Sequence, residues 1–265
     1  MRKVFTILSA ILTFLVIPSV VDASSQQAYQ DYQYQFDQYR SRQSAFQIAM
    51  NEYQQFKSLA AGQDALEKGK LFLAQRDTVA KTYLLFLNER LGENPGMISG
   101  ETALYRSIIT NQIAFLDQNA VLAPSAASFD DAAQISKAFD TQYETMQAAY
   151  RQTIAAIELG YLNYFATRFD NQVVKAQALI AARKSDATPE KQGVLDRWLL
   201  SLSNKHTLYQ QKATAIRTSI PKIIGDTQSQ DRQFLQVQSQ IGAAKQDLSE
   251  AASYLKELEN ALKYE

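Results

Sequence analysis

The feature that most constrains this chain is a heptad repeat of large apolar side chains near its start. Between residues 29 and 53 these side chains follow one another at spacings of 3, 4, 3, 7, 4 and 3 residues. They are Tyr29, Tyr32, Phe36, Tyr39, Phe46, Met50 and Tyr53. Such spacing keeps them on one side of an α-helix, whereas a half-buried strand would alternate every second residue. The Gln/Tyr-rich composition of residues 29–39 is also compatible with a low-complexity tract, but the sustained repeat favours a helix over about residues 25–60.

Helical periodicity continues along the rest of the 265 residues, and 9 Gly and 5 Pro are few for a β protein with many tight turns. The pattern predicts further helices over about residues 64–91, 100–119, 129–184, 189–220 and 226–264. Two adjacent apolar stripes on residues 64–91 indicate a helix that contacts at least two others. The sequence therefore predicts an all-α, elongated helical bundle with coiled-coil-like antiparallel helices, about six in number, forming a single domain over residues 24–265.

Several polar residues and glycines are predicted to mark helix ends. A single helix over residues 129–184 would be about 84 Å long, with Gly160 as its one weak point. Gly92 is expected just after the helix of residues 64–91. The expected helix starts are Ser99 as an N-cap, Ser128 followed by the acid pair Asp130 and Asp131, and the run Thr188-Pro189-Glu190.

The apolar seams of the first and last predicted helices have nearly equal length and complementary bulk. The last seam contains Ala244 and Ala251, which leave room for large partner side chains. We therefore expect these two helices to pair antiparallel after a reversal near Pro221–Gly225. The expected neighbours are Phe36 with Ala251, Tyr39 with Leu248, Phe46 with Ile241, and Met50 with Val237. The alternative is that Pro221 only kinks one long helix, whose second half projects and recruits another molecule, including a second copy of the chain.

The first 23 residues have the pattern of a secretory signal peptide. Arg2 and Lys3 precede an apolar run from Val4 to Val21, and Val21-Asp22-Ala23 supplies small residues at the processing positions. We expect cleavage after Ala23 and export across the cytoplasmic membrane. The alternative is an uncleaved anchor, because about 18 apolar residues are just enough to span a bilayer. The chain has no Cys and so cannot form disulfides, which secreted eukaryotic proteins commonly contain. This absence favours a bacterial protein that is periplasmic, on the cell surface or secreted.

The charge balance indicates no electrostatic partner. The full chain carries 27 basic and 27 acidic residues. Loss of Arg2, Lys3 and Asp22 leaves 25 basic and 26 acidic residues in the mature chain, a net charge of −1. No field of this size would concentrate the chain on DNA, RNA or anionic lipid. We expect protein partners, no nucleic acid, and no transmembrane segment in the mature chain.

The sequence lacks nearly all the residue combinations that catalysis and metal binding use, so we predict no catalytic, cofactor-binding or metal-ligating residues. The absence of Cys excludes thiol nucleophiles, and the single His, His206, cannot form a multi-His zinc site. His206 is expected to be a surface or half-buried structural residue. The pair Asp130/Asp131 is better explained by the positive end of a helix than by acid–base chemistry. A carboxylate-only calcium or magnesium site stays open, although no calcium-binding loop pattern supports one.

These observations favour an exported, non-enzymatic helical rod of the bacterial envelope or exterior that acts as a scaffold, spacer or protein-interaction module. The alternative is an extracytoplasmic ligand- or partner-binding bundle, with a cavity among three apolar belts. The belts are Tyr83–Leu87, Ile157–Phe165 and Leu195–Leu202. A filled core at Tyr83, Tyr161 and Trp198 would count against that cavity. A membrane-active helical toxin is a third alternative, but the nearest uncharged apolar segment, Tyr83–Leu87, is only five residues long.

Two substitutions follow from this interpretation. Leu84→Ala in the predicted belt should cost about 2–5 kcal/mol of stability. His206→Ala should cost no more than about 0.5 kcal/mol if His206 is exposed.

Overall fold

The computed structural model of the protein describes residues 23–183 and 188–263, so all of the predicted signal peptide 1–23 except Ala23 lies outside the described residues. The described residues form six α-helices, which confirms the predicted all-α bundle. The helices are α2 (Ala23–Phe56), α3 (Leu59–Gly92), α4 (Ser99–Leu122), α5 (Phe129–Arg183), α6 (Pro189–Ser219) and α7 (Thr227–Lys263). Two short 3₁₀ turns, η2 (Ala123–Ser125) and η3 (Ile220–Lys222), follow α4 and α6. Within the described ranges, no helix is both long and apolar enough to cross a membrane.

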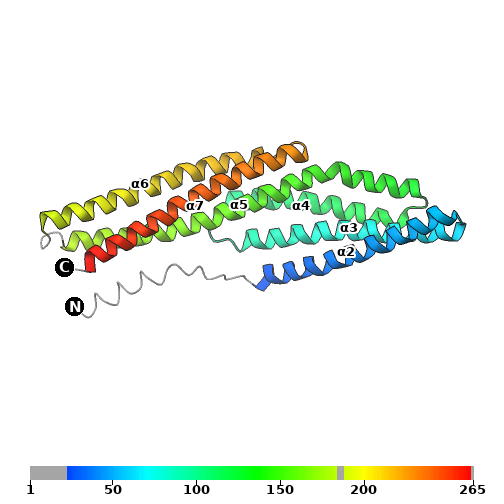
Figure 1. The fold of residues 1–265 in the computed structure, drawn as a ribbon, viewed down its shortest axis with the longest axis horizontal. Coiled ribbons are helices and arrows are strands. Elements are labelled where there is room, and N and C mark those ends of the chain that lie inside the picture. The colour runs from blue at the N-terminus through cyan, green and yellow to red at the C-terminus, as the bar shows by residue number, and fades with distance from the viewer. Residues whose placement is uncertain (1–22, 184–187, 264–265) are drawn as a thin grey trace.

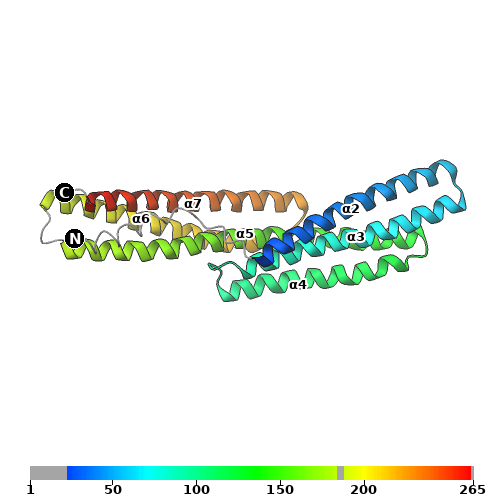
Figure 2. The ribbon, with the colours of Figure 1, turned by 90° about the horizontal axis from the view of Figure 1, so that it is seen from below.

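The molecule is a rod, and α5 runs along most of its length (Figure 1). Helices α2, α3 and α4 lie along the first half of α5, and α6 and α7 lie along its second half (Figure 2). The larger core is shared by α3 to α7 where the two halves overlap; fully buried Leu84, Met146 and Ile216 belong to it. A smaller core at the far end joins α5, α6 and α7 around Leu202 and Leu258.

Helix α5 is continuous through Gly160, so the predicted weak point is not a break. Its 55 residues correspond to about 82 Å of helix. Gly160 instead lets the turn between α3 and α4 approach the helix closely, because a Cβ there would lie 2.7 Å from Asn94 Nδ2 and 2.7 Å from Met97 Sδ. Asn94 Nδ2 donates a hydrogen bond to the carbonyl of Ile157 at 2.6 Å, which fixes that turn on α5.

The predicted boundary between the first two helices was wrong by several residues. Helix α2 ends at Phe56 and α3 begins at Leu59, whereas we expected a break between residues 60 and 64. Lys57 turns the chain with a φ of 51°, and Ser58 caps α3 by accepting a hydrogen bond from the Ala61 N–H at 3.2 Å. Gly62, which falls within the expected break, lies inside α3 beneath the Tyr53 ring, where a Cβ would sit 3.0 Å from Tyr53 Cε2.

The other predicted helix ends divide into confirmed and wrong assignments. Ser128 and Thr188 cap their helices by accepting hydrogen bonds from Asp131 N at 3.1 Å and Lys191 N at 3.3 Å. Ser99 is not an N-cap, because it is the first helical residue of α4 and Ile98 precedes it. Gly92 is the last residue of α3 and does not follow the helix as expected.

The predicted pairing of the first and last helices was wrong. Helix α2 packs on α3 and helix α7 packs on α6 and α5, so α2 and α7 belong to different halves of the rod (Figure 2). The bulky α2 seam instead meets glycines of α3: a Cβ on Gly69 would lie 3.1 Å from Phe46 Cε2. This excludes all four expected neighbour pairs: Phe36–Ala251, Tyr39–Leu248, Phe46–Ile241 and Met50–Val237.

Candidate functional site

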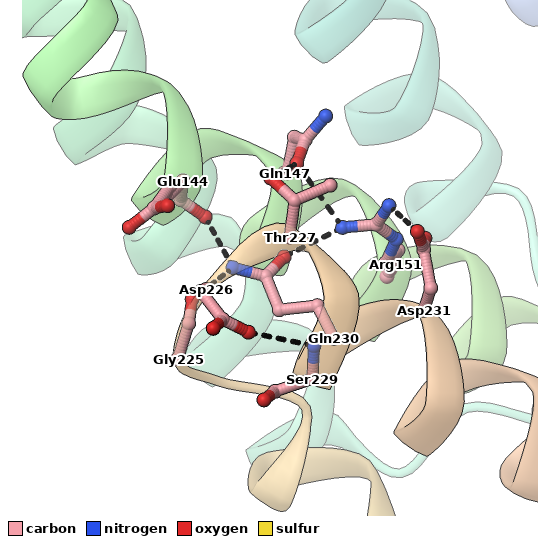
Figure 3. Close-up of polar contacts among 9 residues, drawn as sticks. All are labelled: Glu144, Gln147, Arg151, Gly225, Asp226, Thr227, Ser229, Gln230 and Asp231. Atoms are coloured by element: carbon pink, nitrogen blue, oxygen red, sulfur yellow. Dashed lines mark hydrogen bonds and ion pairs between the residues drawn. The ribbon is translucent and has the colours of Figure 1, made fainter.

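A densely connected polar cluster lies where the start of α7 meets α5 (Figure 3). Gln230 is 1% exposed, and its amide nitrogen donates to the carbonyls of Glu144 at 2.8 Å and Gly225 at 2.7 Å. Its carbonyl oxygen accepts from Arg151 Nη1 at 2.6 Å, and Arg151 Nη2 also bonds to Asp231. Both hydrogens of the Gln230 amide nitrogen are used, so this cluster holds the α6–α7 turn against α5.

Two further polar clusters join α6 to its neighbours. Asp247 of α7 is buried between Lys205 and Lys212, at 3.3 and 2.5 Å. Burial raises the pKa of Asp247, but the hydrogen bonds from the two lysines outweigh it and hold the pKa below its ordinary value. His206 Nε2 lies 3.1 Å from Asp170 Oδ1 of α5 and is half-buried, as expected for a structural residue.

The predicted acid pair serves a helix end. The Asp131 carboxylate accepts hydrogen bonds from the backbone N–H groups of Ala127 at 2.9 Å and Ser128 at 3.0 Å. These bonds lower the pKa of Asp131. Among the residues that the structure describes, no group of three or more His, Cys, Asp or Glu could hold a metal ion.

A different region has the properties of a binding site: a groove over α3, between α2 and α5, with a volume of about 490 Å³. This volume lies in the usual range for ligand pockets. Its lining is mostly aromatic, and one guanidinium and one carboxylate interrupt it. The lining residues are Tyr32, Tyr39, Phe72, Arg76, Val79, Ala80, Tyr83, Phe139, Asp140, Tyr143 and Tyr150.

Ring contacts close one end of this aromatic groove and hold its walls. The Tyr83 ring of α3 lies 5.1 Å from Tyr32 of α2 and 5.1 Å from Tyr150 of α5. Towards the other end, Tyr39 contacts Phe72 with ring centroids 5.4 Å apart. Burial raises the pKa of Tyr32, Tyr83 and Tyr150, so these phenols stay protonated at neutral pH and can donate hydrogen bonds.

Arg76 is the positively charged residue of the aromatic groove. Its guanidinium lies 3.8 Å from the centroid of the Phe139 ring, and Nη1 donates to Ser136 Oγ at 3.0 Å. The Asp140 carboxylate, which is exposed, lies 3.8 Å from Nη1. Nε and Nη2 are buried without a hydrogen-bond partner among the described residues. Buried donors without partners cost free energy, so the guanidinium is held in this position by its stacking on Phe139 and its bond to Ser136 and not by a full set of hydrogen bonds.

A buried carboxylate lies behind the groove. Asp77 Oδ2 accepts a hydrogen bond from Asn119 Nδ2 at 2.8 Å, and Oδ1 lies 3.9 Å from Arg76 Nε. Burial raises the pKa of Asp77 to about 6, although the bond from Asn119 and the charge of Arg76 oppose the rise. Near neutral pH the charges of Arg76, Asp77 and Asp140 therefore do not sum to an excess of positive charge, and the groove is not suited to an anion.

No protein-family model, no curated protein and no solved structure matches the chain. The interpretation of the groove therefore depends on its geometry and chemistry.

The sequence analysis named one residue of the aromatic groove and missed the charged ones. Tyr83 belongs to one of the three belts among which the alternative hypothesis placed a cavity, and it lines the groove. The three belts do not enclose one cavity, because Leu195 and Leu202 belong to the far core and Leu84 and Ile157 to the central core. A signal for Arg76 exists in the sequence: the α3 stripe runs through residues 72, 79, 83 and 86, and residue 76 fills its seven-residue gap. A charge at such a position is unusual on a core-facing stripe.

Proposed function

We propose that this chain is an exported, non-enzymatic helical rod of the bacterial envelope or exterior that binds a protein partner through the aromatic groove. The observation that carries the proposal is the groove itself, in which aromatic faces from three helices surround the partly unsatisfied guanidinium of Arg76. The long α5 gives the molecule the reach of a spacer, and the groove gives it a place to dock a partner.

The chemistry of the groove favours a proline-rich segment in the polyproline II conformation. Such a segment presents backbone carbonyls as acceptors, lacks most N–H donors, and docks in aromatic-lined grooves. The groove has the complementary character, because its lining contains several tyrosine hydroxyls, which can donate hydrogen bonds. Two carboxylates, Asp77 and Asp140, accompany the single positive charge of Arg76, which also disfavours a phosphorylated or acidic ligand.

The dimensions are compatible with a short segment. From Phe72 to Tyr83 the groove floor extends over 11 residues of α3, or about 16 Å. A polyproline II helix rises about 3.1 Å per residue, so about five residues would fill this length. We therefore expect a recognition motif of about this length, with affinity in the micromolar range or weaker, because so small an interface leaves little surplus after the cost of association.

The test is binding of the mature chain, residues 24–265, to an array of proline-containing decapeptides and to the same peptides with each proline replaced by alanine. Positive sequences are then titrated by isothermal calorimetry. We expect saturable binding that is lost on proline replacement, and that is weakened at least tenfold by Tyr39→Ala or Tyr143→Ala.

Tyr34→Ala is the matched control, because Tyr34 is a 61% exposed tyrosine of α2 that does not line the groove. It should leave binding unchanged. If no proline-containing peptide binds, or if Tyr34→Ala and Tyr143→Ala weaken binding equally, the groove is not the recognition surface.

Export has a separate test. Mass spectrometry of the protein from its own host should find a chain that starts at Ser24. A chain with an intact Met1 in the membrane fraction would support the anchored alternative.

A further inference from the structure

The first turn of α2 lies against the end of α3, where two glutamates face it. The hydroxyl of Ser24 donates to Glu93 Oε1 at 2.6 Å and lies 3.0 Å from Glu89 Oε2. The backbone N–H of Ser25 donates to the same Oε1 of Glu93 at 2.8 Å. Ser25 is completely buried, so this contact is part of the interface between the two helices. The carboxylates therefore meet the residue at which the mature chain would begin.

Glu93 is held as a carboxylate at this place. Partial burial raises its pKa, but the hydrogen bonds from Ser24 and Ser25 and the charge of Arg90 outweigh it, so the pKa lies below its ordinary value. The first turn of α2 contains no acidic residue of its own, and negative charge is favoured at a helix N-terminus. Independently, Glu93 Oε2 is buried and has no hydrogen-bond partner within the described part of the chain. The position can therefore accept one more donor.

We infer that Glu89 and Glu93 bind the α-ammonium group that signal-peptide cleavage creates at Ser24, and that this contact fastens α2 to α3 in the processed chain. The inference rests on the proposed export. Hydrolysis of the Ala23–Ser24 amide consumes one water, leaves a carboxylate on Ala23, and frees the Ser24 amine, which takes up a proton. Before cleavage the same nitrogen is an uncharged amide.

The covalent geometry of serine brings the new charge within reach. The nitrogen and Oγ of one serine lie about 3–4 Å apart. Because Ser24 Oγ lies 2.6 and 3.0 Å from the two carboxylates, the ammonium nitrogen lies at most about 6–7 Å from these oxygens, close to the range of about 4–6 Å over which opposite charges shift each other's ionisation.

Two arginines also lie at this corner. Arg90 of α3 lies with its guanidinium 5.2 Å from the Tyr161 ring centroid. Arg106 of α4 lies over Gly92, where a Cβ would meet its Nη2 at 2.6 Å. The two carboxylates and two guanidinium groups balance, so the ammonium is drawn by its proximity to Glu93 and not by a net negative field.

The test compares two forms of the mature chain, residues 24–265: one with a free Ser24 amine, and one whose Ser24 amine is acetylated. Acetylation leaves the amino-acid sequence unchanged and removes the positive charge of the Ser24 amine. At pH 6.5 we expect the free-amine form to unfold at a midpoint about 2–4 °C higher. An ordinary α-amine has a pKa of about 7.7–8.0, and binding to carboxylates raises it. The difference should therefore be fully present below that range and disappear as the pH rises through the raised value, by about pH 10.

Glu93→Gln and a matched control decide the assignment. In Glu93→Gln the difference between the free and acetylated forms should be smaller, and with Glu89→Gln added it should vanish. In Glu52→Gln, which changes an exposed glutamate of α2, it should persist. Equal midpoints for the free and acetylated forms between pH 6 and 10, or an undiminished difference in Glu93→Gln, would overturn the inference. A host chain that keeps Met1 would instead overturn the export step, and would leave the contact measured with these chains standing.

Discussion

Gly96 and Gly160 meet backbone to backbone at the centre of the rod. A Cβ on Gly96 would lie 1.8 Å from the Gly160 carbonyl oxygen and 2.6 Å from the Tyr164 nitrogen. The turn between α3 and α4 can therefore rest on α5 only because residue 96 has no side chain. This contact positions the end of α3 and the start of α4 in the central core.

Gly96→Ala should therefore destabilise the protein by about 3 kcal/mol or more, because backbone atoms on α5 cannot move aside as a flexible side chain can. Gly160→Ala should cost less, since its Cβ would meet the side-chain ends of Asn94 and Met97. Gly242→Ala is the control: a Cβ there meets nothing within 4 Å in the interior of α7, and the change should stabilise by about 0.5–1 kcal/mol. Urea denaturation would measure the series, and equal losses for Gly96 and Gly242 would contradict it.

Asp77 should make stability depend on pH in an unusual direction. Its pKa is about 6 in the folded protein and about 3.9 in an unfolded chain, so folding favours the protonated form. This group's contribution is present in full below about pH 4 and is lost as the pH rises through 6, a difference of roughly 3 kcal/mol. Asp77→Asn should therefore increase stability at pH 8 and change it little at pH 4.

Denaturant unfolding of Asp77→Asn and of the parent chain between pH 4 and 8 would check this. Asp64→Asn serves as the control, because the Asp64 side chain is 54% exposed and forms only a surface ion pair with Lys68 at 4.0 Å. A constant difference between Asp77→Asn and the parent across this pH range would show that Asp77 titrates normally.

Gln230 should be among the most costly polar residues to replace. Gln230→Leu leaves the carbonyls of Glu144 and Gly225 without this donor and removes an acceptor from Arg151. At about 1 kcal/mol for each bond, the loss should be about 2–4 kcal/mol. Gln228→Leu, at an exposed position two residues earlier, should change stability by less than about 0.5 kcal/mol. A double-mutant cycle with Arg151→Met would show additive effects if the two side chains did not interact.

Helices and helix caps were predicted better from the sequence than the pairing of helices, and α2 shows the physical reason. A heptad seam specifies which face of a helix is buried, but it does not specify what covers that face. The large side chains of the α2 seam pack against Gly62 and Gly69 of α3. From the sequence alone, Ala244 and Ala251 of α7 were an equally good set of small residues for them to pack against. The turn at Lys57 was missed because it contains neither Gly nor Pro, although Ser58 was available as a cap.

The candidate site was harder to predict, because its polar residues interrupt the patterns that define the helices. Arg76 and Asp77 fill the gaps in the two apolar stripes of α3, and Asn119 lies on the buried face of α4. Reading only the apolar members of a stripe passes over such residues. That Asp77 would meet Asn119, 42 residues later, depends on how α3 and α4 pack together and cannot be derived from either stripe alone.

The two cores should respond differently to the loss of a buried leucine. Leu84 and Leu258 are both 0% exposed, so each substitution by Ala should cost about 2–5 kcal/mol where unfolding is complete. Leu84 lies in the core shared by α3 to α7, whereas Leu258 lies in the far core, which only α5, α6 and α7 build. A smaller set of contacts can open locally at lower free energy than the whole molecule.

Hydrogen exchange should resolve this difference. In Leu258→Ala we expect faster exchange in the last turns of α5, the first turns of α6 and the end of α7, with protection retained in α3 and α4. In Leu84→Ala protection should fall in both halves of the rod, because α5 and α7 both contribute to the central core and extend from it. Leu235→Ala is the control, because Leu235 of α7 is 66% exposed. His206→Ala is not a suitable control, because His206 is half-buried beside Asp170 and the small cost expected for its replacement applied only to an exposed histidine. If Leu258→Ala lowered protection equally along α3 and α7, the rod would unfold as a single cooperative unit, and the far core would have no independent stability.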